Sequence, residues 1–282
     1  MNNPVGAKSA KNRILRVLLY AFVIVTCVVT LYPYFVMFTT AAKTGADITS
    51  GGVLPQKWVW SNFSDVFKNA PVAKYIMNSV IVAGGATCVA ILCGIPAAYA
   101  LSRMKFRGQK VFLAIVIISQ MFSPIVLLIG IYRIMVTFGL TDNLFGLILI
   151  NAAFNQAFTI WLLRGTFMSI SSDMEQAATI DGCSRFQAMV RVLLPMAAPG
   201  IVTTLIYVLI NAWNEYTIAF VLIATDTKKP ITVGINIFNG YNIIEWQYLF
   251  ATSLFATIPV IILFIAIEKY LVSGLTAGGV KG

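Results

Sequence analysis

Residues 76–110 read IMNSVIVAGGATCVAILCGIPAAYALSRMKFRGQK, and this stretch decides the fold class of the chain. Its first 26 residues hold no charged side chain. A helix needs roughly 20 mostly apolar residues to cross the hydrocarbon core of a bilayer, so this run is long enough to span it. Ser102–Lys110 follows with four positive charges, which is typical of the cytoplasmic side of a membrane. The stretch therefore predicts a spanning helix that ends in the cytoplasm.

Apolar runs of sufficient length recur along the whole chain, at 15–38, 76–101, 111–138, 144–164, 201–224 and 248–271. The first run exceeds the ~7–15 residues of a signal-peptide core, and no clean Ala-x-Ala cleavage site follows it, so we expect it to be retained. We predict an all-α integral membrane protein that crosses the bilayer about six times. Residues 1–282 would form a single transmembrane domain.

The composition agrees with a protein that lies in lipid. Hydrophobic residues make up 59% of the chain and charged residues only 11%, against roughly 25% charged in soluble proteins. The net charge is +10, but the basic residues lie beside apolar runs and form no continuous patch, so we expect no nucleic-acid partner. The chain has no histidine, and its four cysteines lack zinc or redox spacing. We therefore expect no metal site, no bound cofactor and no disulfide.

The distribution of Lys and Arg predicts the orientation. With the N-terminus inside, thirteen of the 20 basic residues are cytoplasmic, as the positive-inside rule requires. Both termini are then cytoplasmic, as an N-terminal arm over 1–14 and a C-terminal tail over 272–282. The segments 39–75 and 225–247 would lie on the outer face.

One segment outside the predicted spans carries two helix-start signals. Ser172 is followed three residues later by Glu175, and Ser184 by Gln187, and both pairs fit a capping box. Gly182 lies between them, where a helix commonly ends in a left-handed residue. This pattern predicts a helix–glycine–helix hairpin over 171–195 on the cytoplasmic side.

Two prolines and a small surface complete the hairpin prediction. Pro195 should prevent the second helix from continuing, whereas Pro199 suits the first turn of the fifth span. On the first helix one face is unusually small, so that another protein can approach its backbone; it holds Met174, Ala177, Ala178 and Asp181. The alternative is a linker that folds back on the helix bundle, and residue physics alone leaves both open.

Three motifs in this chain resemble those of a known family. Gln176-Ala177-Ala178-Thr179-Ile180-Asp181-Gly182, then nine residues, then Val192-Leu193-Leu194-Pro195, resembles the EAA loop of ABC-importer permeases. The family's glutamate position is Gln176 here, with Glu175 displaced by one residue, about 100° around a helix. Asn211–Tyr216 resembles the Trp-Asn-acidic signature of maltose-type carbohydrate importers. Gly274–Gly282 is similar to the tail of their second permease subunit.

The resemblance implies a type I ABC importer permease in a bacterial plasma (inner) membrane. Its partners would be a second permease, two ATPase subunits, a solute-binding protein that delivers sugar, and membrane lipid. The chain has no G-x-x-x-x-G-K-[ST] loop, so it would not be an enzyme, and ATP and Mg would bind to the partner ATPases. By resemblance the ATPase-coupling residues are Glu175, Gln176, Ala177, Ala178, Asp181, Gly182, Leu194 and Pro195. The residues of the tail that would reach the ATPases are Leu275, Thr276, Gly278 and Lys281.

Polar side chains within the spans are candidates for a substrate path. They are Gln120, Asn151, Asn155, Asn211, Asn214 and Glu215. They suit sugar hydroxyls, or else they bond the helices to one another or to the partner permease. Glu215 lies either deep in the fifth span or near its outer end. A non-sugar solute such as a glycerophosphate is an alternative, and an ion-coupled secondary transporter is a more distant one, since only Glu215 is a candidate coupling acid.

Overall fold

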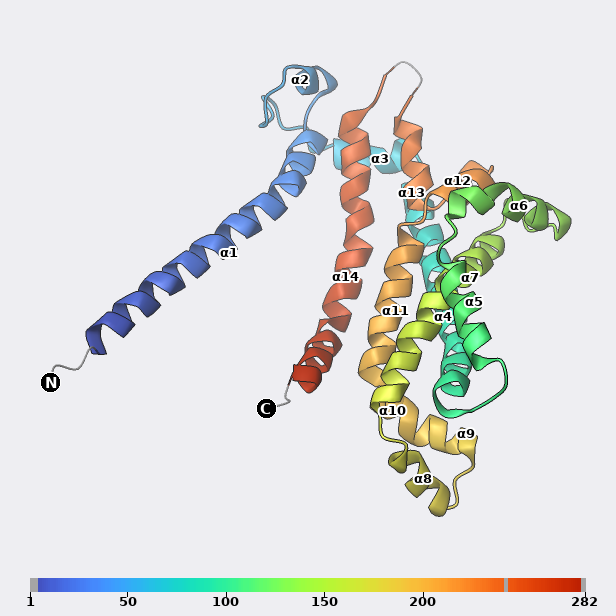
Figure 1. The fold of residues 1–282 in the computed structure, drawn as a ribbon. Coiled ribbons are helices and arrows are strands. Elements are labelled where there is room, and N and C mark those ends of the chain that lie inside the picture. The colour runs from blue at the N-terminus through green and yellow to red at the C-terminus, as the bar shows by residue number, and fades with distance from the viewer. Residues whose placement is uncertain (1–4, 241–242, 280–282) are drawn as a thin grey trace. The chain divides into compact units, whose positions relative to one another are not determined.

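The computed structural model describes residues 5–240 and 243–279, with side chains described for Arg13, 15–240 and 243–266. The described chain is helical throughout, apart from loops and one isolated antiparallel bridge between Asn239 and Ile244. Figure 1 labels the α-helices. In chain order the helices are α1 (Val5–Ala41), α2 (Gly45–Thr49), α3 (Asn62–Asn69), α4 (Val72–Arg103), α5 (Gln109–Ser119), α6 (Pro124–Thr137), α7 (Leu144–Ser169), α8 (Asp173–Ile180), α9 (Arg185–Ala188), the π-helix η1 (Met189–Leu193), α10 (Leu194–Met196), α11 (Ala198–Trp213), α12 (Thr217–Leu222), the 3₁₀ helix η2 (Asp226–Lys228), α13 (Ile231–Gly234), the 3₁₀ helix η3 (Ile235–Phe238) and α14 (Trp246–Gly279).

The prediction of an all-α protein with several apolar spans is confirmed. In the described part of the chain four helices are long and apolar enough to cross a membrane, at Leu15–Ala41, Val72–Arg103, Leu144–Ser169 and Trp246–Ala266. Two further helix pairs pass the same test but are bent, by 102° between α5 and α6 and by 77° between α9–α10 and α11. The number of spans is therefore four to six.

The third predicted span, 111–138, is not a straight helix. It breaks at Gln120–Ser123, between α5 and α6. Ser123 is extended, with ψ 134°, and Pro124 is the first residue of α6. A residue before proline is driven out of the helical region by a clash with the proline ring, so the helix must end and restart here. The predicted span 111–138 is therefore a bent pair of helices.

The fifth predicted span, 201–224, ends early. The helix α11 stops at Trp213, and α12 begins at Thr217. The carboxylate of Glu215 accepts hydrogen bonds from the N–H groups of Ile218 and Ala219, at 2.6 and 3.0 Å, and so satisfies the first turn of α12. A new helix start therefore replaces the continuation that the apolar sequence predicted.

The chain forms two compact units, 1–69 with 238–255 and 70–237 with 256–282. In the first unit, Asn62 holds the end of α1 to the segment before α3. Its side-chain amide donates to the carbonyl oxygens of Ala41 and Lys43, both at 2.8 Å. The rings of Trp58 and Trp60 stack with their centroids 5.3 Å apart. This segment is ordered by its own polar and aromatic contacts.

In the second unit, α4 and α7 pack along most of their length, and α11 packs against both. Small residues allow the close approach. A Cβ atom added to Gly94 of α4 would lie 2.5 Å from the Cγ2 atom of Thr159 on α7, and one added to Gly200 of α11 would lie 2.3 Å from the Cγ2 atom of Thr166. Glycine at such contacts lets helix backbones meet, as membrane helix interfaces commonly require.

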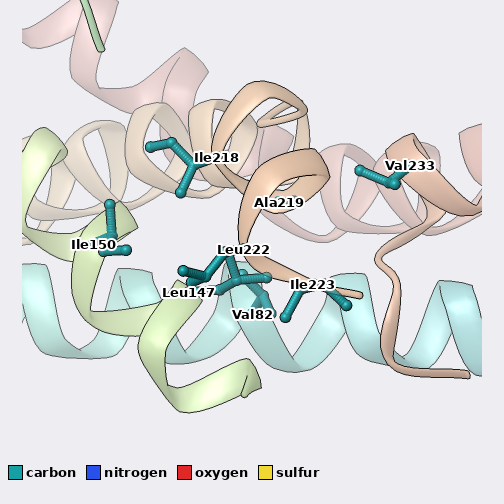
Figure 2. Packing of buried hydrophobic residues seen from close by; sticks show 8 residues of the cluster. All are labelled: Val82, Leu147, Ile150, Ile218, Ala219, Leu222, Ile223 and Val233. Atoms are coloured by element: carbon teal, nitrogen blue, oxygen red, sulfur yellow. The ribbon is translucent and has the colours of Figure 1, made fainter. Parts of the chain in front are cut away.

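An apolar cluster fixes α12 against this pair of helices (Figure 2). Residues from α4, α7, α12 and α13 meet in it, namely Val82, Leu147, Ile150, Ile218, Ala219, Leu222, Ile223 and Val233. All of them are buried. The cluster holds the short helix α12 rigidly, although the chain is broken just before it.

A polar network ties the turn before α7 to the segment after α12. The carboxylate of Asp142, a residue with φ 52°, accepts from the N–H groups of Ala224 and Thr225, at 3.1 and 2.8 Å. The Nζ atom of Lys228 lies 2.8 Å from the same carboxylate. The hydrogen bond from Lys228, followed by those from Thr225, holds the pKa of Asp142 below its ordinary value. Sequence patterns gave no signal for this network.

Candidate functional site

The first helix of the hairpin (171–195) ends as the sequence predicts. Gly182 is left-handed, with φ 88°. The N–H of Cys183 donates to the carbonyl oxygen of Ala178 at 2.9 Å, and the N–H of Gly182 donates to that of Thr179 at 3.1 Å. This pair of bonds is a Schellman motif, which needs a residue with positive φ at the glycine position. The sharp turn between α8 and α9 therefore depends on Gly182.

One of the two predicted capping boxes forms and the other does not. The N–H of Ser184 donates to Oε1 of Gln187 at 2.9 Å, and the N–H of Gln187 donates to Oγ of Ser184 at 3.3 Å, which confirms the second box. At the first, Ser172 makes no side-chain cap. The N–H of Asp173 instead donates to Oγ of Ser171 at 3.2 Å. The prediction of a capping box at Ser172 was wrong, because the side chain of Glu175 binds other groups and not the backbone N–H of Ser172.

The second helix of the hairpin was predicted to stop at Pro195, but it continues past this residue. It passes through a π-helical turn at Met189–Leu193 and continues as α10 to Met196, so that the 77° bend follows at Ala197. A π-turn is a local widening of the helix, and here it directly precedes the residue that lacks an N–H. Pro199 lies in the first turn of α11, as predicted.

Apolar packing fixes the hairpin to the spanning helices. Met189 and Leu193 of the second hairpin helix pack in one buried cluster with Tyr99 of α4 and with Leu163 and Phe167 of α7. Leu193, Leu163 and Phe167 are fully buried. The alternative of a linker that folds back on the bundle is thus partly right, since one side of the hairpin packs on α4 and α7.

A polar contact reinforces this attachment. We call Tyr99, Arg103 and Glu175 the α4–α8 clamp. The Nε atom of Arg103 lies 2.5 Å from Oε1 of Glu175, and the hydroxyl of Tyr99 donates to Oε2 at 3.0 Å. Arg103 also donates through Nη2 to the carbonyl oxygen of Ile170 at 2.8 Å. The side chains of Arg103 and Glu175 are only 14% and 12% exposed, so the ion pair is largely removed from water.

The coupling residues predicted from the sequence divide between two surroundings. Three of them face the chain itself: Glu175 is in the α4–α8 clamp, Ala178 is 8% exposed, and Leu194 packs against the apolar cluster around Leu193. The prediction that Ala178 shares an open face with its neighbours was wrong, because α8 turns it toward the second hairpin helix. The other five are exposed, namely Gln176, Ala177, Asp181, Gly182 and Pro195.

Sequence reasoning missed two exposed apolar side chains on the hairpin. Ile180 is 86% exposed at the end of α8, and Phe186 is 69% exposed on α9. Large apolar groups are depleted from surfaces that face only water. The sequence did offer one signal for them, because both apolar residues occur in a segment that is predicted to lie outside the membrane. Together with Ala177 and Asp181 they form what we call the outward face of the hairpin.

The structure brings all six candidate substrate-path residues to one cavity of about 420 Å³. They come from the break between α5 and α6, from α7, from α11 and from the break before α12. The six are Gln120, Asn151, Asn155, Asn211, Asn214 and Glu215. Residues far apart in sequence thus converge because the break between α5 and α6 and the break between α11 and α12 both lie beside α7.

The amides in this cavity bond mostly to their own helices. Asn151 and Asn155 donate to the carbonyl oxygens four residues earlier, at 2.9 and 2.8 Å, and Asn211 does the same at 2.8 Å. Only Gln120 donates across to another helix, to the carbonyl oxygen of Phe154 at 3.2 Å. The interpretation that these groups bond helices together therefore applies to Gln120. Glu215 lies at the junction of α11 and α12, where it caps α12.

The predicted tail contacts lie near the limit of the described chain. Leu275, Thr276 and Gly278 belong to α14, whose backbone is helical to Gly279. Lys281 lies outside the described residues. A role of this segment in reaching a partner stays a prediction.

Known proteins resemble this chain over most of its length. A family model described as "Binding-protein-dependent transport system inner membrane component" matches residues 90–277. The inner membrane ABC transporter permease protein YcjP of Escherichia coli (strain K12) is 32% identical over 96% of this chain and 99% of its own. The diacetylchitobiose uptake system permease protein DasC of Streptomyces coelicolor is 32% identical, over 89% of this chain and 92% of its own.

A solved structure has the same fold. It is the crystal structure of a bacterial ABC transporter involved in the import of the acidic polysaccharide alginate. One of its chains superposes with a TM-score of 0.79 at 28% identity, over 92% of this chain and 97% of that chain.

Proposed function

This chain belongs to the family of binding-protein-dependent transport system inner membrane components, and from that premise we propose that it is one permease subunit of an ATP-driven sugar importer. It would pair with a second permease subunit to enclose the path. A solute-binding protein would deliver the sugar, and two ATPase subunits would bind the ATP and Mg. The chain itself would bind no cofactor and catalyse no reaction.

The outward face of the hairpin is the observation that carries this proposal. Ala177 and Ile180 are exposed on α8, and Phe186 is strongly exposed on α9. Exposed apolar side chains on both hairpin helices, with a small exposed residue on the first, suit insertion into a groove of another protein, since buried aromatic and aliphatic anchors dominate interface energies. On its other side the hairpin is held by the α4–α8 clamp and the buried cluster of α4 and α7. Movement of a docked ATPase would thus pass to the spanning helices.

The polar cavity supports a sugar as the substrate. Its described lining contains amides, hydroxyls and the carboxylate of Glu215, and no lysine or arginine. Sugar hydroxyls need both donors and acceptors, which amides supply. A glycerophosphate would need cationic partners for its phosphate. Tyr207 also lines the cavity, with its ring stacked on that of Phe158 at a centroid distance of 3.8 Å. Two of the similar proteins are named for diacetylchitobiose uptake and alginate import.

The proposed location is the plasma (inner) membrane of a bacterium, with both termini in the cytoplasm. The four positive charges of Ser102–Lys110 support this orientation. They follow the end of α4 that contacts the hairpin through Arg103. The hairpin would then lie on the cytoplasmic side, where ATP is available. The break between α11 and α12 would lie toward the outer side, from which sugar enters.

Reconstitution with its partners tests the proposal. The full chain would be co-expressed with the second permease and the ATPase subunits, placed in vesicles, and supplied with the solute-binding protein and its sugar. We expect uptake that requires ATP. Ala177→Trp should weaken co-purification of the ATPase by about tenfold or more, equivalent to about 1.4 kcal/mol, whereas Ala177→Ser should not. Uptake that persists without ATP under an ion gradient would instead support a secondary transporter, and unimpaired assembly of the tryptophan variant would refute the docking role.

A further inference from the structure

A second cavity, of about 760 Å³, lies between the end of α4 and the hairpin. Residues 104–106 form one wall, and α8 and the start of α9 form the other. Its volume falls within the range of about 300–1,000 Å³ that is usual for small-molecule sites. This cavity is separate from the polar cavity and shares no lining residue with it.

The charge of this cavity is positive. Arg103, Lys105 and Arg185 line it, and Glu175 is the one acid among its described lining residues. Arg103 is paired with Glu175 in the α4–α8 clamp. Lys105 and Arg185 are exposed, and neither forms an ion pair among the described side chains. Two cations therefore face the cavity with no acid to neutralise them.

The remaining polar groups suit the same kind of ligand. Ser172 at the start of α8 and Gln176 on α8 line the cavity and supply a hydroxyl and an amide donor, whereas the hydroxyl of Thr179 donates to the carbonyl oxygen of Glu175 at 2.8 Å. Guanidinium and ammonium groups with additional neutral donors are the usual partners of a phosphate group. A carboxylate ligand is also anionic, but it has fewer acceptor oxygens than a phosphate group. The donors of this cavity lie on both of its walls, so a phosphate group suits them better.

The position of the cavity favours a ligand at the membrane surface. Met104 and Phe106 line it and are exposed, in the basic segment that directly follows a spanning helix. Basic pockets beside spanning helices on the cytoplasmic side bind anionic lipid head groups. The exposed side chains of Met104 and Phe106 on this wall would contact the acyl chains of the lipid.

The cavity lies on one side of α8. Successive residues of a helix are about 100° apart, so Ser172, Gln176 and Thr179 share one face of α8. Met174, Ala177 and Asp181 lie about half a turn away, on the opposite face. The ligand would therefore lie on the side of α8 opposite Met174, Ala177 and Asp181, whereas Gln176, which the family resemblance assigns to the ATPase contact, lines the cavity itself.

We propose that this cavity is a binding site for an anionic phosphate group, which Lys105 and Arg185 hold between the end of α4 and the hairpin. The group would come from an anionic phospholipid of the surrounding leaflet or from a soluble phosphate. The inference does not rest on the sugar substrate or on the ATPase partners. It adds a ligand that joins the spanning helix α4 to the hairpin, beside the α4–α8 clamp.

Titration of the purified full chain in a neutral detergent tests the site. The probes are dihexanoyl phosphatidylglycerol, the zwitterionic dihexanoyl phosphatidylcholine, which has no net charge, and inorganic phosphate, with binding measured by calorimetry. We expect Lys105→Gln and Arg185→Gln each to weaken binding by about fivefold, the effect of about 1 kcal/mol per cation near a membrane surface. Arg107→Gln and Lys110→Gln are the matched controls, because they remove one charge from the same basic segment but do not line the cavity.

The three probes also distinguish the source of the phosphate. Binding of phosphatidylglycerol alone, lost in the two cavity variants, supports the site and assigns it to lipid. Binding of inorganic phosphate with the same dependence supports it and assigns it to a soluble ligand. Equal loss in the control variants, or no binding of either anion, would overturn the proposal. So would cavity variants that bind phosphate normally but no longer co-purify with the ATPase, because the cavity would then belong to a protein interface.

Discussion

Replacement of Arg103 by methionine should destabilise the chain strongly, because it leaves Glu175 charged and nearly buried without its partner. The side chain of Glu175 is 12% exposed, and its Oε1 atom lies 2.5 Å from Nε of Arg103. Removal of one member of a buried ion pair costs about 3–5 kcal/mol. Since both side chains keep some contact with water, we expect the lower end, about 3 kcal/mol.

The double replacement Arg103→Met with Glu175→Met should recover most of this loss. A buried ion pair exchanged for apolar side chains of similar volume is often neutral or stabilising. The coupling energy in this double-mutant cycle should be about 2 kcal/mol, well above the ~0.5 kcal/mol within which independent sites add. Glu175→Met alone should also destabilise, because it leaves the guanidinium with only the hydrogen bond to the carbonyl oxygen of Ile170.

Thermal unfolding of the four proteins in the same membrane mimetic measures this cycle. A loss of 3 kcal/mol corresponds to a decrease in Tm of about 6–12 °C for a domain of this size. Arg107→Met is the control, because Arg107 is exposed and makes no ion pair among the described residues, and it should shift stability by less than about 0.5 kcal/mol. Additive single effects would refute the reasoning, because the clamp would then contribute no specific attachment of the hairpin.

Three further substitutions have matched controls, and all are measured by thermal unfolding of the full chain. Gly94→Ala should destabilise by about 1–3 kcal/mol, because its Cβ would lie 2.5 Å from a methyl group of the neighbouring helix. Gly84→Ala should be neutral or stabilising, since its Cβ meets nothing within 4 Å, and equal effects would contradict the packing described here. Ser184→Ala should lower stability by about 1 kcal/mol, and Ser172→Ala, which removes no cap, by less than about 0.5 kcal/mol. The pKa of Asp142 is lower in the folded chain than the unfolded value of about 3.9. Its contribution to the free energy of unfolding should therefore be present above about pH 4 and be lost as the pH falls toward the folded pKa. Asp142→Asn should abolish this pH dependence, and a variant with an unchanged pH profile would contradict the prediction.

Apolar length predicts the spanning helices well but not their breaks. The runs 76–101 and 144–164 were predicted by length and composition, and each lies within one helix of the structure. The run 111–138 is equally apolar, but its Pro124 restarts the helix after a bend of 102°. A proline can kink a helix or end it, and the outcome depends on whether neighbouring helices satisfy the exposed backbone groups. That information lies in tertiary packing and not in the run itself.

The polar cavity also shows what the sequence cannot predict. Asn151 and Asn155 share one face of α7 by their spacing, which the sequence reveals. Their convergence with Gln120 and Glu215 requires the break between α5 and α6 and the break between α11 and α12, and the apolar pattern does not reveal the second. Residue types thus identified the candidates, and only the fold placed them together. Lys105 and Arg185 were noted only as charges that set the orientation, because nothing in their spacing indicates a shared cavity.

The displaced glutamate of the EAA-like motif acquires a physical explanation from the α4–α8 clamp. In the family pattern a carboxylate stands at the position of Gln176, whereas here the carboxylate lies one residue earlier. A shift of one residue turns a side chain by about 100° around the helix, and this turn carries Glu175 from the exposed surface to Arg103 of α4. The charge therefore stabilises the attachment of the hairpin within the chain and is not available to a docking partner. If the partner requires a carboxylate, Asp181 on the outward side must supply it, because Gln176 offers only a neutral amide.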